Sequence, residues 1–188
     1  QLKFNIFEGE KILIERVNIE GNQVTDESVI RSELLVDEGD PFSNLNLEKS
    51  VSNLKSRNLF QTVKKSVSQG SSPDLKIIDI IVEEKATGEI SAGAGIGTDG
   101  GSFAINIKEN NWLGKGNKVG FELELSKESI KGEISYANPN YDLLGNTLQF
   151  SAANSTNDKP EQGYKNNVLE AGVGTSFEQF KDVYTNVG

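Results

Sequence analysis

The acidic side chains in the second half of the chain are the residues closest to a catalytic arrangement. Glu122 and Glu124 are two positions apart, so on a strand they point the same way. Two carboxylates can share the roles of general acid and general base. Nothing distinguishes this pair from the other acidic residues of the same strand face, so we predict a hydrated surface and no catalytic residues.

Composition excludes several classes of chemistry. The 188 residues include neither Cys nor His, which excludes disulfides, thiol nucleophiles, zinc sites built on those ligands and triads with a His base. The net charge of −9 argues against a nucleic-acid partner, because such a partner requires a basic stripe. We therefore expect a protein without enzymatic activity, metal or cofactor.

Residues 89–178 form six segments in which apolar and polar residues alternate one by one, separated by Gly, Asn, Asp and Pro. A strand with this period presents its two faces to two environments. Soluble sandwiches and lipocalin-like barrels also alternate, but they pack large side chains inward, whereas the polar face here is rich in Gly and Ser. The pattern favours a transmembrane β-barrel, and six strands with the start of a seventh cannot close one.

The ends of these segments predict how they would cross a membrane. The turns at residues 110–116 and 139–145 fall at one end, and they carry Trp112 and Tyr141 as candidate membrane-interface aromatics. The opposite ends are short polar hairpins and a longer polar loop over residues 155–167. Short inner turns and longer outer loops are typical of outer-membrane barrels.

Residues 9–87 follow another pattern, which predicts a separate domain. A strand reaching Gly21-Asn22 is followed by a helix that starts at Thr25 or Asp26 and ends at residues 39–41. A second helix, capped by Asn44 or Asn46, carries a buried stripe of Leu47, Val51, Leu54 and Leu59. Strands over residues 62–69 and 75–83 complete a β-α-α-β-β order.

The first eight residues resemble the last strand of that domain. The alternation of residues 1–8 is similar to that of residues 75–83, at a distance of one whole β-α-α-β-β unit. We therefore expect residues 1–8 to be the last strand of a preceding repeat, and the chain to be an internal piece of a longer protein.

Motifs along the chain resemble the BamA family of outer-membrane protein assembly factors, whose periplasmic repeats are called POTRA domains. The matching segments, in order, are Gly21-Asn22, Leu59-Phe60, residues 82–88, the glycine-rich residues 93–97, residues 111–116 and residues 138–141. The last departs from the family pattern, since its aromatic residue comes one position late. The resemblance implies an α+β POTRA domain over residues 9–87, followed by the first antiparallel strands of a sixteen-stranded barrel over residues 88–188.

The resemblance also implies a function and a location. It implies insertion of β-barrel proteins into the outer membrane of Gram-negative bacteria, with the POTRA domain in the periplasm. Expected partners are unfolded outer-membrane proteins, periplasmic lipoprotein subunits of the assembly complex and outer-membrane lipid. A related POTRA-barrel translocation pore and a non-translocating periplasmic interaction module, binding through residues 75–83 or 62–69, are the alternatives.

Two sets of site residues follow. A nascent strand in lipid needs partners for its N–H and C=O groups, and a sheet edge could supply them. The candidate seam strand for this templating consists of Glu89, Ile90, Ser91, Ala92, Gly93, Ala94, Gly95, Ile96 and Gly97. Its glycines either weaken the seam or permit strong curvature. In the POTRA domain the resemblance implies Arg31, Glu33 and Glu38 as partner contacts, although a solvated helix surface also accounts for them.

Overall fold

The computed structural model describes residues 11–97, 100–142, 144–180 and 183–188, and its contacts divide the chain into two compact units. The first unit ends at Lys85 and the second continues from Ala86, while the short segment Val24–Asp26 is grouped with the second. The strand predicted over residues 1–8 lies outside the described residues and stays a prediction.

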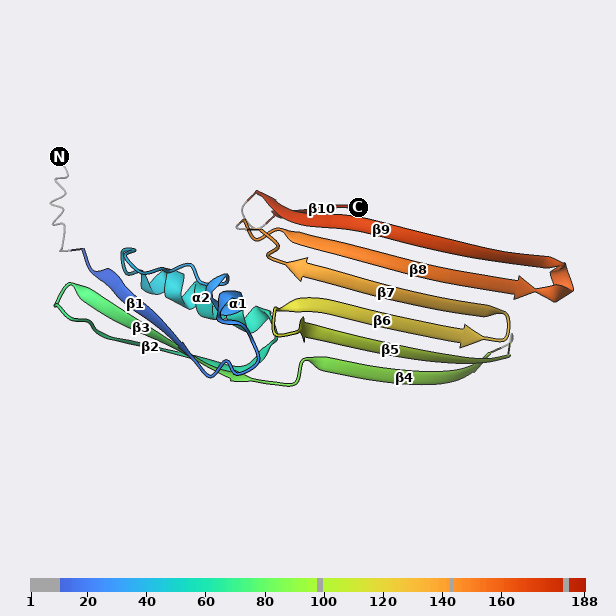
Figure 1. Ribbon diagram of the computed structural model, residues 1–188, viewed down its shortest axis with the longest axis horizontal. Coiled ribbons are helices and arrows are strands. Elements are labelled where there is room, and N and C mark those ends of the chain that lie inside the picture. The colour runs from blue at the N-terminus through green and yellow to red at the C-terminus, as the bar shows by residue number, and fades with distance from the viewer. Residues whose placement is uncertain (1–10, 98–99, 143, 181–182) are drawn as a thin grey trace, which may run out of the picture. The chain divides into compact units, whose positions relative to one another are not determined.

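The first unit is a three-stranded sheet covered by two helices (Figure 1). Its elements are β1 (Leu13–Glu20), α1 (Glu27–Arg31), α2 (Asn44–Ser56), β2 (Phe60–Gln69) and β3 (Leu75–Glu84). The strand order is β1-β3-β2, with β3 parallel to β1 and antiparallel to β2. The prediction that residues 75–83 offer a free edge is therefore wrong, because β3 has a partner on both sides. The apolar run at Ile77-Ile78 and Ile80-Ile81 suits a central strand better than an edge.

The core of this unit lies between the sheet and α2. The predicted stripe is buried, since Leu47, Val51 and Leu54 line the inner face of the helix and Leu59 follows just past its end. These side chains pack with Ile14, Val17, Ile30, Val36, Phe60, Val63, Ile78, Ile80 and Val82. Burial of one apolar face of each element holds the unit together.

A polar contact crosses all three strands on the other face of the sheet. The carboxylate of Asp79 on β3 accepts hydrogen bonds from Asn18 Nδ2 on β1 (2.7 Å) and from Ser66 Oγ on β2 (2.9 Å). The hydrogen bond from Asn18, then that from Ser66, holds the pKa of Asp79 below its usual value, against a smaller opposing effect of burial. Neighbouring strands are thus linked on the solvated face as well as in the core.

The first helix is shorter than the sequence predicts. Helix α1 ends at Arg31 rather than near Gly39, and the chain continues in turns. The cause is a contact with α2, where Ser50 Oγ accepts a hydrogen bond from Leu35 N at 2.8 Å. The turn lets Val36 enter the core and leaves Leu35 exposed, although helical periodicity would bury it.

The cap of the second helix also differs from the prediction. Ser43, with an extended backbone, precedes the helix, and its Oγ accepts a hydrogen bond from Asn46 N at 3.3 Å. Asn44 and Asn46 lie inside the first turn of α2, so the prediction that one of them is the cap is wrong. A short hydroxyl side chain at this position satisfies one of the N–H groups that a helix start leaves open.

The second unit is one antiparallel sheet of seven strands in chain order (Figure 1). The strands are β4 (Gly88–Gly97), β5 (Gly100–Trp112), β6 (Asn117–Ser126), β7 (Ser129–Pro139), β8 (Thr147–Lys159), β9 (Tyr164–Phe180) and β10 (Val183–Val187). Six long strands and a short seventh agree with the predicted truncated barrel. Neither α-helix in the described part of the chain has the length and apolar character needed to cross a bilayer.

The longer outer loop predicted over residues 155–167 is instead a continuation of two strands. Strands β8 and β9 extend through this region, and only the 3-10 turn Pro160–Gln162 separates them. Amides pair across the strands, Asn154 Nδ2 with Asn167 Oδ1 at 3.0 Å and Asn157 Nδ2 with Asn166 Oδ1 at 3.3 Å. The prediction of a loop was wrong because polar residues that hydrogen-bond across a strand pair stabilise the pair as apolar residues do.

Candidate functional site

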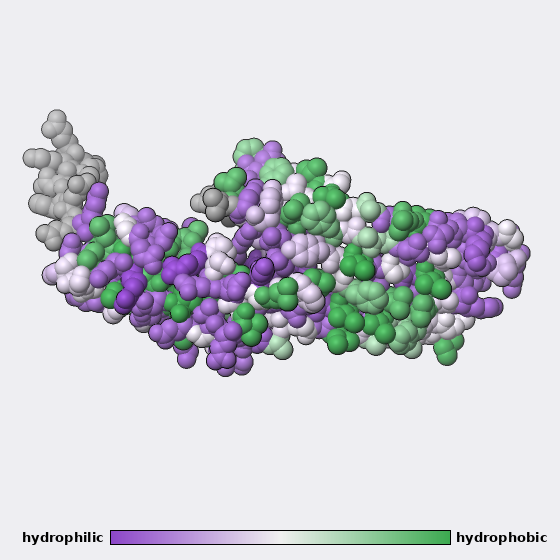
Figure 2. Space-filling model, in the orientation of Figure 1, coloured by the Kyte–Doolittle hydropathy of each residue, from purple (hydrophilic) through white to green (hydrophobic). Residues whose placement is uncertain are grey.

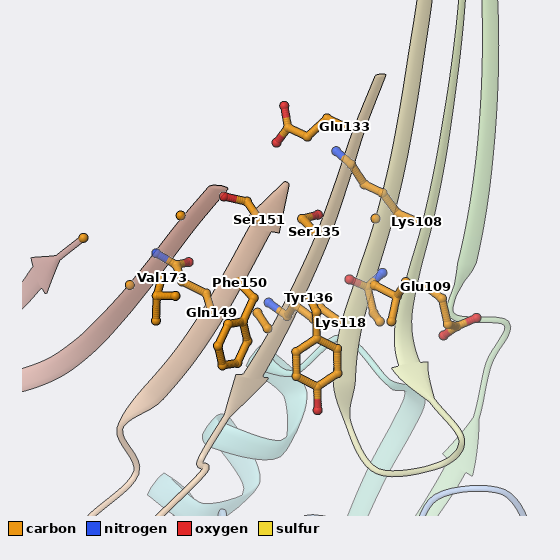
Figure 3. A pocket seen from close by; sticks show the side chains of 17 residues that line it. Lys108, Glu109, Lys118, Glu133, Ser135, Tyr136, Gln149, Phe150, Ser151 and Val173 are labelled. Carbon is orange, nitrogen blue, oxygen red and sulfur yellow. The ribbon is translucent and has the colours of Figure 1, made fainter. Parts of the chain in front are cut away.

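The strand register gathers the apolar side chains of the second unit on one face of the sheet. Ile90 lies opposite Ile107, Ile107 opposite Phe121, and Phe121 opposite Ile134. In another row, Tyr136 lies opposite Phe150, and the two tilted rings have centroids 6.4 Å apart and point to the same side (Figure 3). Alternation within strands and register between them thus create a continuous apolar surface.

This surface is not buried by any part of the described chain. All of its fully buried apolar side chains belong to the first unit, whereas Ile90 and Ile96 of the second are 79% and 95% exposed. Hydrophobic side chains gather over the middle of the sheet, and hydrophilic ones lie toward its far end (Figure 2). A soluble sandwich would pack this face inward, so its exposure favours contact with lipid.

Strand β4 contains the whole candidate seam and forms one edge of the sheet. It pairs with β5 from Gly88 opposite Glu109 to Gly97 opposite Gly100, and in the described chain no strand lies on its other side. Alternate residues of an edge strand direct N–H and C=O outward, so roughly five of each remain open on a ten-residue strand. This edge is where another strand could add.

Space and backbone conformation do not require the three glycines at positions 93, 95 and 97 of β4. A Cβ atom added at Gly93 or Gly97 would meet no atom within 4 Å, and one at Gly95 would approach only Ser102 Oγ, at 3.3 Å. None of the three has a positive φ. Glycine at these positions removes side-chain packing and weakens the strand. The seam and strong curvature both stay predictions for these residues.

The opposite face of the sheet is polar and hollow. Gly120, Ser135, Ser151 and Gly172 lie in one row across β6–β9 and line an open hollow of about 590 Å³. Ser135 and Ser151 point to the same side of the sheet (Figure 3). Glu122 faces Glu133, and Glu124 faces Lys131. Among the described residues no group of three or more potential ligands could hold a metal ion. Glu122 and Glu124 lie two positions apart on β6, on the same face of the sheet.

A hydrogen-bond network in the turn after β5 was not predicted as part of the site. Glu109 accepts hydrogen bonds from Asn111 N (2.7 Å) and from the Thr87 hydroxyl, and Asn111 Oδ1 accepts one from Gly116 N (2.8 Å). Gly116 has a φ of 65°, which favours glycine. The motif over residues 111–116 was the sequence feature from which this network could have been predicted. Its polar residues fix the turn that carries Trp112.

The two candidate interface aromatics occupy corresponding turns. Trp112 ends β5 before the β5–β6 turn, and Tyr141 lies in the β7–β8 turn. Both are 46% exposed. Because every second turn of an antiparallel sheet in chain order lies at the same end, the two rings lie at one end of the sheet, as an interfacial girdle requires.

The three charged residues predicted as partner contacts do not form one group. Arg31 contacts Glu38, with Nη1 and Oε1 3.4 Å apart, and Glu27, with Nε and Oε1 2.7 Å apart. The hydrogen bond to Glu27, opposed by desolvation, and the negative charges of both carboxylates raise the pKa of Arg31. Glu33 instead pairs at 3.5 Å with Arg57, the residue that follows α2, and burial lowers the pKa of Arg57 despite the carboxylate.

Known proteins resemble both units. The family described as surface antigen variable number repeat (POTRA) matches residues 12–85. An outer membrane protein assembly factor of Treponema pallidum is 31% identical over 141 residues, which are 71% of this chain and 17% of that protein. BamA of Neisseria meningitidis is 25% identical over 182 residues, which are 96% of this chain and 22% of that protein. The chain thus spans about a fifth of the length of these curated relatives.

Two solved structures also resemble this chain. The crystal structure of Haemophilus ducreyi BamA lacking POTRA domains 1–3 superposes with a TM-score of 0.79 and 26% identity, over 92% of this chain and 34% of that chain. CdiB of Acinetobacter baumannii shares the fold, with a TM-score of 0.60 and 15% identity over 89% of this chain and 34% of that chain.

A POTRA domain followed by antiparallel strands with one apolar and one polar face defines the class of POTRA-barrel proteins. Within that class, the chain belongs to the BamA family of outer-membrane assembly factors, which confirms the resemblance seen in its motifs. The barrel strands accordingly lie in the bacterial outer membrane and the POTRA domain in the periplasm.

Proposed function

We propose that the chain belongs to a protein that folds β-barrel proteins into the outer membrane, with β4 as the strand that templates them. The observation that supports this proposal is that β4 pairs on one side only within the described residues, at the edge of a sheet whose apolar face is exposed. A client strand in lipid has no water to satisfy its backbone, and each open N–H or C=O group costs several kcal/mol. The edge of β4 offers partners for those groups.

The glycines of β4 support the same proposal. A seam that opens and closes must pair weakly with its own closing strand, and glycine lowers strand stability by about 0.5–1 kcal/mol relative to alanine. Three such positions occur in β4, where neither φ nor steric contact with this chain demands glycine. The function is binding and release of strands and involves no catalytic residue.

The proposed templating function implies a set of partners. Clients are unfolded outer-membrane proteins, the apolar face contacts outer-membrane lipid, and periplasmic lipoprotein subunits bind the POTRA domain around Arg31, Glu33 and Glu38. Trp112 and Tyr141 contact the membrane interface. The side chains of Arg31 and Glu38 are 39% and 40% exposed, so a charged partner could reach them.

A reversible covalent lock tests the templating proposal. In the full-length protein, Ser91→Cys on β4 is paired with a cysteine on the closing strand of the barrel, and this chain contributes no native thiol. A disulfide requires Cα atoms within about 7 Å. We expect client barrels to stop accumulating under oxidation and to accumulate again under reduction, while the locked barrel stays folded.

A matched lock separates this effect from general stiffening of the barrel. Ser135 and Ser151 lie directly opposite each other on β7 and β8, so Ser135→Cys with Ser151→Cys joins two strands that are already paired. This second lock should leave client assembly unchanged. Unchanged assembly with the β4 lock fully oxidised would contradict templating at β4.

A POTRA-barrel translocation pore is the first alternative, and the same lock distinguishes it. Passage through a lumen does not need the seam to open, so secretion of a substrate would continue with the β4 lock closed. The hollow polar face of β6–β9 is the feature that this alternative would use.

A periplasmic interaction module is the second alternative. Its site would be β2, which has β3 as its single neighbouring strand among the described residues and carries Lys64 and Lys65. Edge lysines discourage casual pairing but leave the backbone open to a specific partner strand.

A further inference from the structure

The sheet of the POTRA domain has two outer strands, and their outer edges differ. Within the described residues, the order β1-β3-β2 leaves one side of β1 and one side of β2 without a strand. Along the start of β1, the backbone of residues 39–42 supplies partners. Phe42 N donates to Ile12 O (2.8 Å), Gly39 N donates to Ile14 O (2.7 Å), and Ile14 N donates to Asp40 O (2.9 Å).

Farther along β1, two charged side chains bond to the backbone on the same outer side of the strand. Val17 N donates to Glu38 Oε1 at 3.1 Å, and Val17 O accepts from Arg31 Nη2 at 3.2 Å. The two side chains also pair with each other, at 3.4 Å between Arg31 Nη1 and Glu38 Oε1. One donor and one acceptor thus occupy the positions that an added strand would use, an arrangement that we call the edge clasp.

A third side chain, that of Glu27, fixes the position of Arg31 in the edge clasp. Glu27, four residues before Arg31, accepts from Arg31 Nε at 2.7 Å and fixes the guanidinium over the edge. Hydrogen bonds in which one partner is ionised are shorter and stronger than neutral ones. An incoming strand would have to displace two such bonds and separate an ion pair before it could pair with Val17.

The outer edge of β2 has no such cover in the described part of the chain. There β2 bonds only to β3 through its backbone, and neither a backbone segment nor a charged pair bonds to its other side. The ion pair between Lys65 and Glu48 (2.6 Å) lies beside β2 without touching its backbone.

We propose that the edge clasp of Arg31 and Glu38 is a guard that prevents an extended polypeptide from adding to β1, so that strand addition to this sheet is confined to β2. The guard goes beyond the templating proposed for β4 and does not depend on it. Its removal exposes β1 to the most available extended strand, which in a pure sample is β1 of a second copy.

Hydrogen exchange tests the first half of this proposal. In the full-length protein folded in detergent micelles, Glu38→Met removes the acceptor for Val17 N while keeping a side chain of similar length. We expect the Val17 amide to exchange roughly tenfold faster or more, as for loss of a hydrogen bond to a charged group. The central-strand amides of Ile78 and Ile80 should keep their protection. Unchanged exchange at Val17 would overturn the proposal.

Self-association tests the second half. The Arg31→Met/Glu38→Met variant should form dimers in analytical ultracentrifugation at concentrations where the parent protein is monomeric. The matched variant Glu48→Met/Lys65→Met, which removes the pair beside β2, should behave as the parent does. A clasp variant that stays monomeric would overturn the guard. If the double variant loses protection at Ile78, the single variant Arg31→Met, which leaves Val17 N bonded, decides the same test.

Discussion

Substitution of Leu54 by Ala should destabilise the POTRA domain by roughly 3–5 kcal/mol, as for large-to-small changes in a packed core. Leu54 is 0% exposed and sits on the inner face of α2, in one cluster with Ile78 and Ile80 of the central strand. The helix and the central strand are both fixed by hydrogen bonds along their length, so the site has little freedom to collapse around the smaller side chain.

This loss is large compared with the stability available to the domain. A domain spanning residues 12–85 has a total stability of about 4–11 kcal/mol, at about 0.05–0.15 kcal/mol per residue. For a domain of this size each kcal/mol lowers the melting temperature by about 4–8 °C. The variant should therefore melt roughly 12–40 °C below the parent segment, or fail to fold at ambient temperature.

The assay is urea and thermal denaturation of residues 9–87 followed by far-ultraviolet circular dichroism. Leu45→Ala is the matched control, because Leu45 lies in the same helix and is 64% exposed. Its effect should stay within about 0.5 kcal/mol. The reasoning fails if Leu54→Ala costs less than about 1 kcal/mol, if the two variants are equal, or if the parent segment shows no cooperative transition.

Three further outcomes are expected. Phe60→Ala should cost roughly 3–5 kcal/mol in the same denaturation assay, because the ring is 6% exposed in the core; a cost below about 1 kcal/mol would place it outside the core. The lowered pKa of Asp79 means that its contribution to stability is present above the unfolded value near ~3.9 and is lost as the pH falls through the folded pKa. The urea midpoint should fall in that range, and less so in Asn18→Ala; an identical fall in both proteins would refute this cause. In the full-length protein, a cysteine label at Lys159 should react from outside intact cells, whereas one at Lys115 should require a permeabilised outer membrane; reaction of both from outside would contradict the threading.

The barrel strands were predictable from the sequence because their signal is local. Period-two alternation from Ile90 to Val173 fixes which face each side chain takes, and short turns fix antiparallel order. The end of α1 was not predictable in this way, since it depends on Ser50, fifteen residues after Leu35. The extension of β8 and β9 was missed because Asn reads as a turn residue until its cross-strand partner, such as Asn167 for Asn154, is known.

The site residues also divide into those that local sequence predicts and those that depend on tertiary contacts. The sequence places Arg31 and Glu38 on one charged surface, and a solvated helix face was the simplest account of them. Their common target, the backbone of Val17, lies 14 and 21 residues away along the chain. Only the tertiary fold brings donor, acceptor and strand edge together, so the clasp could not be found from residue types and spacing.

Each of the two units has a sheet edge that is not paired with a strand in the described chain. The edge of β1 lies in water and the edge of β4 lies in lipid. In water β1 is closed with Arg31 and Glu38, because their charged groups stay about 40% exposed and need little desolvation. A charged side chain at the centre of a bilayer costs about 2.5–3.5 kcal/mol on insertion scales, so the same device would be expensive on a membrane strand. Strand β4 accordingly has Glu89 as its only charged residue, near its first end, followed by Gly, Ala, Ser and Ile. Such an edge in lipid can be satisfied only by another strand. The edge of the POTRA sheet can therefore remain without a partner strand, whereas the edge of the barrel sheet requires one. For this reason the exchange of one partner strand for another is proposed at β4.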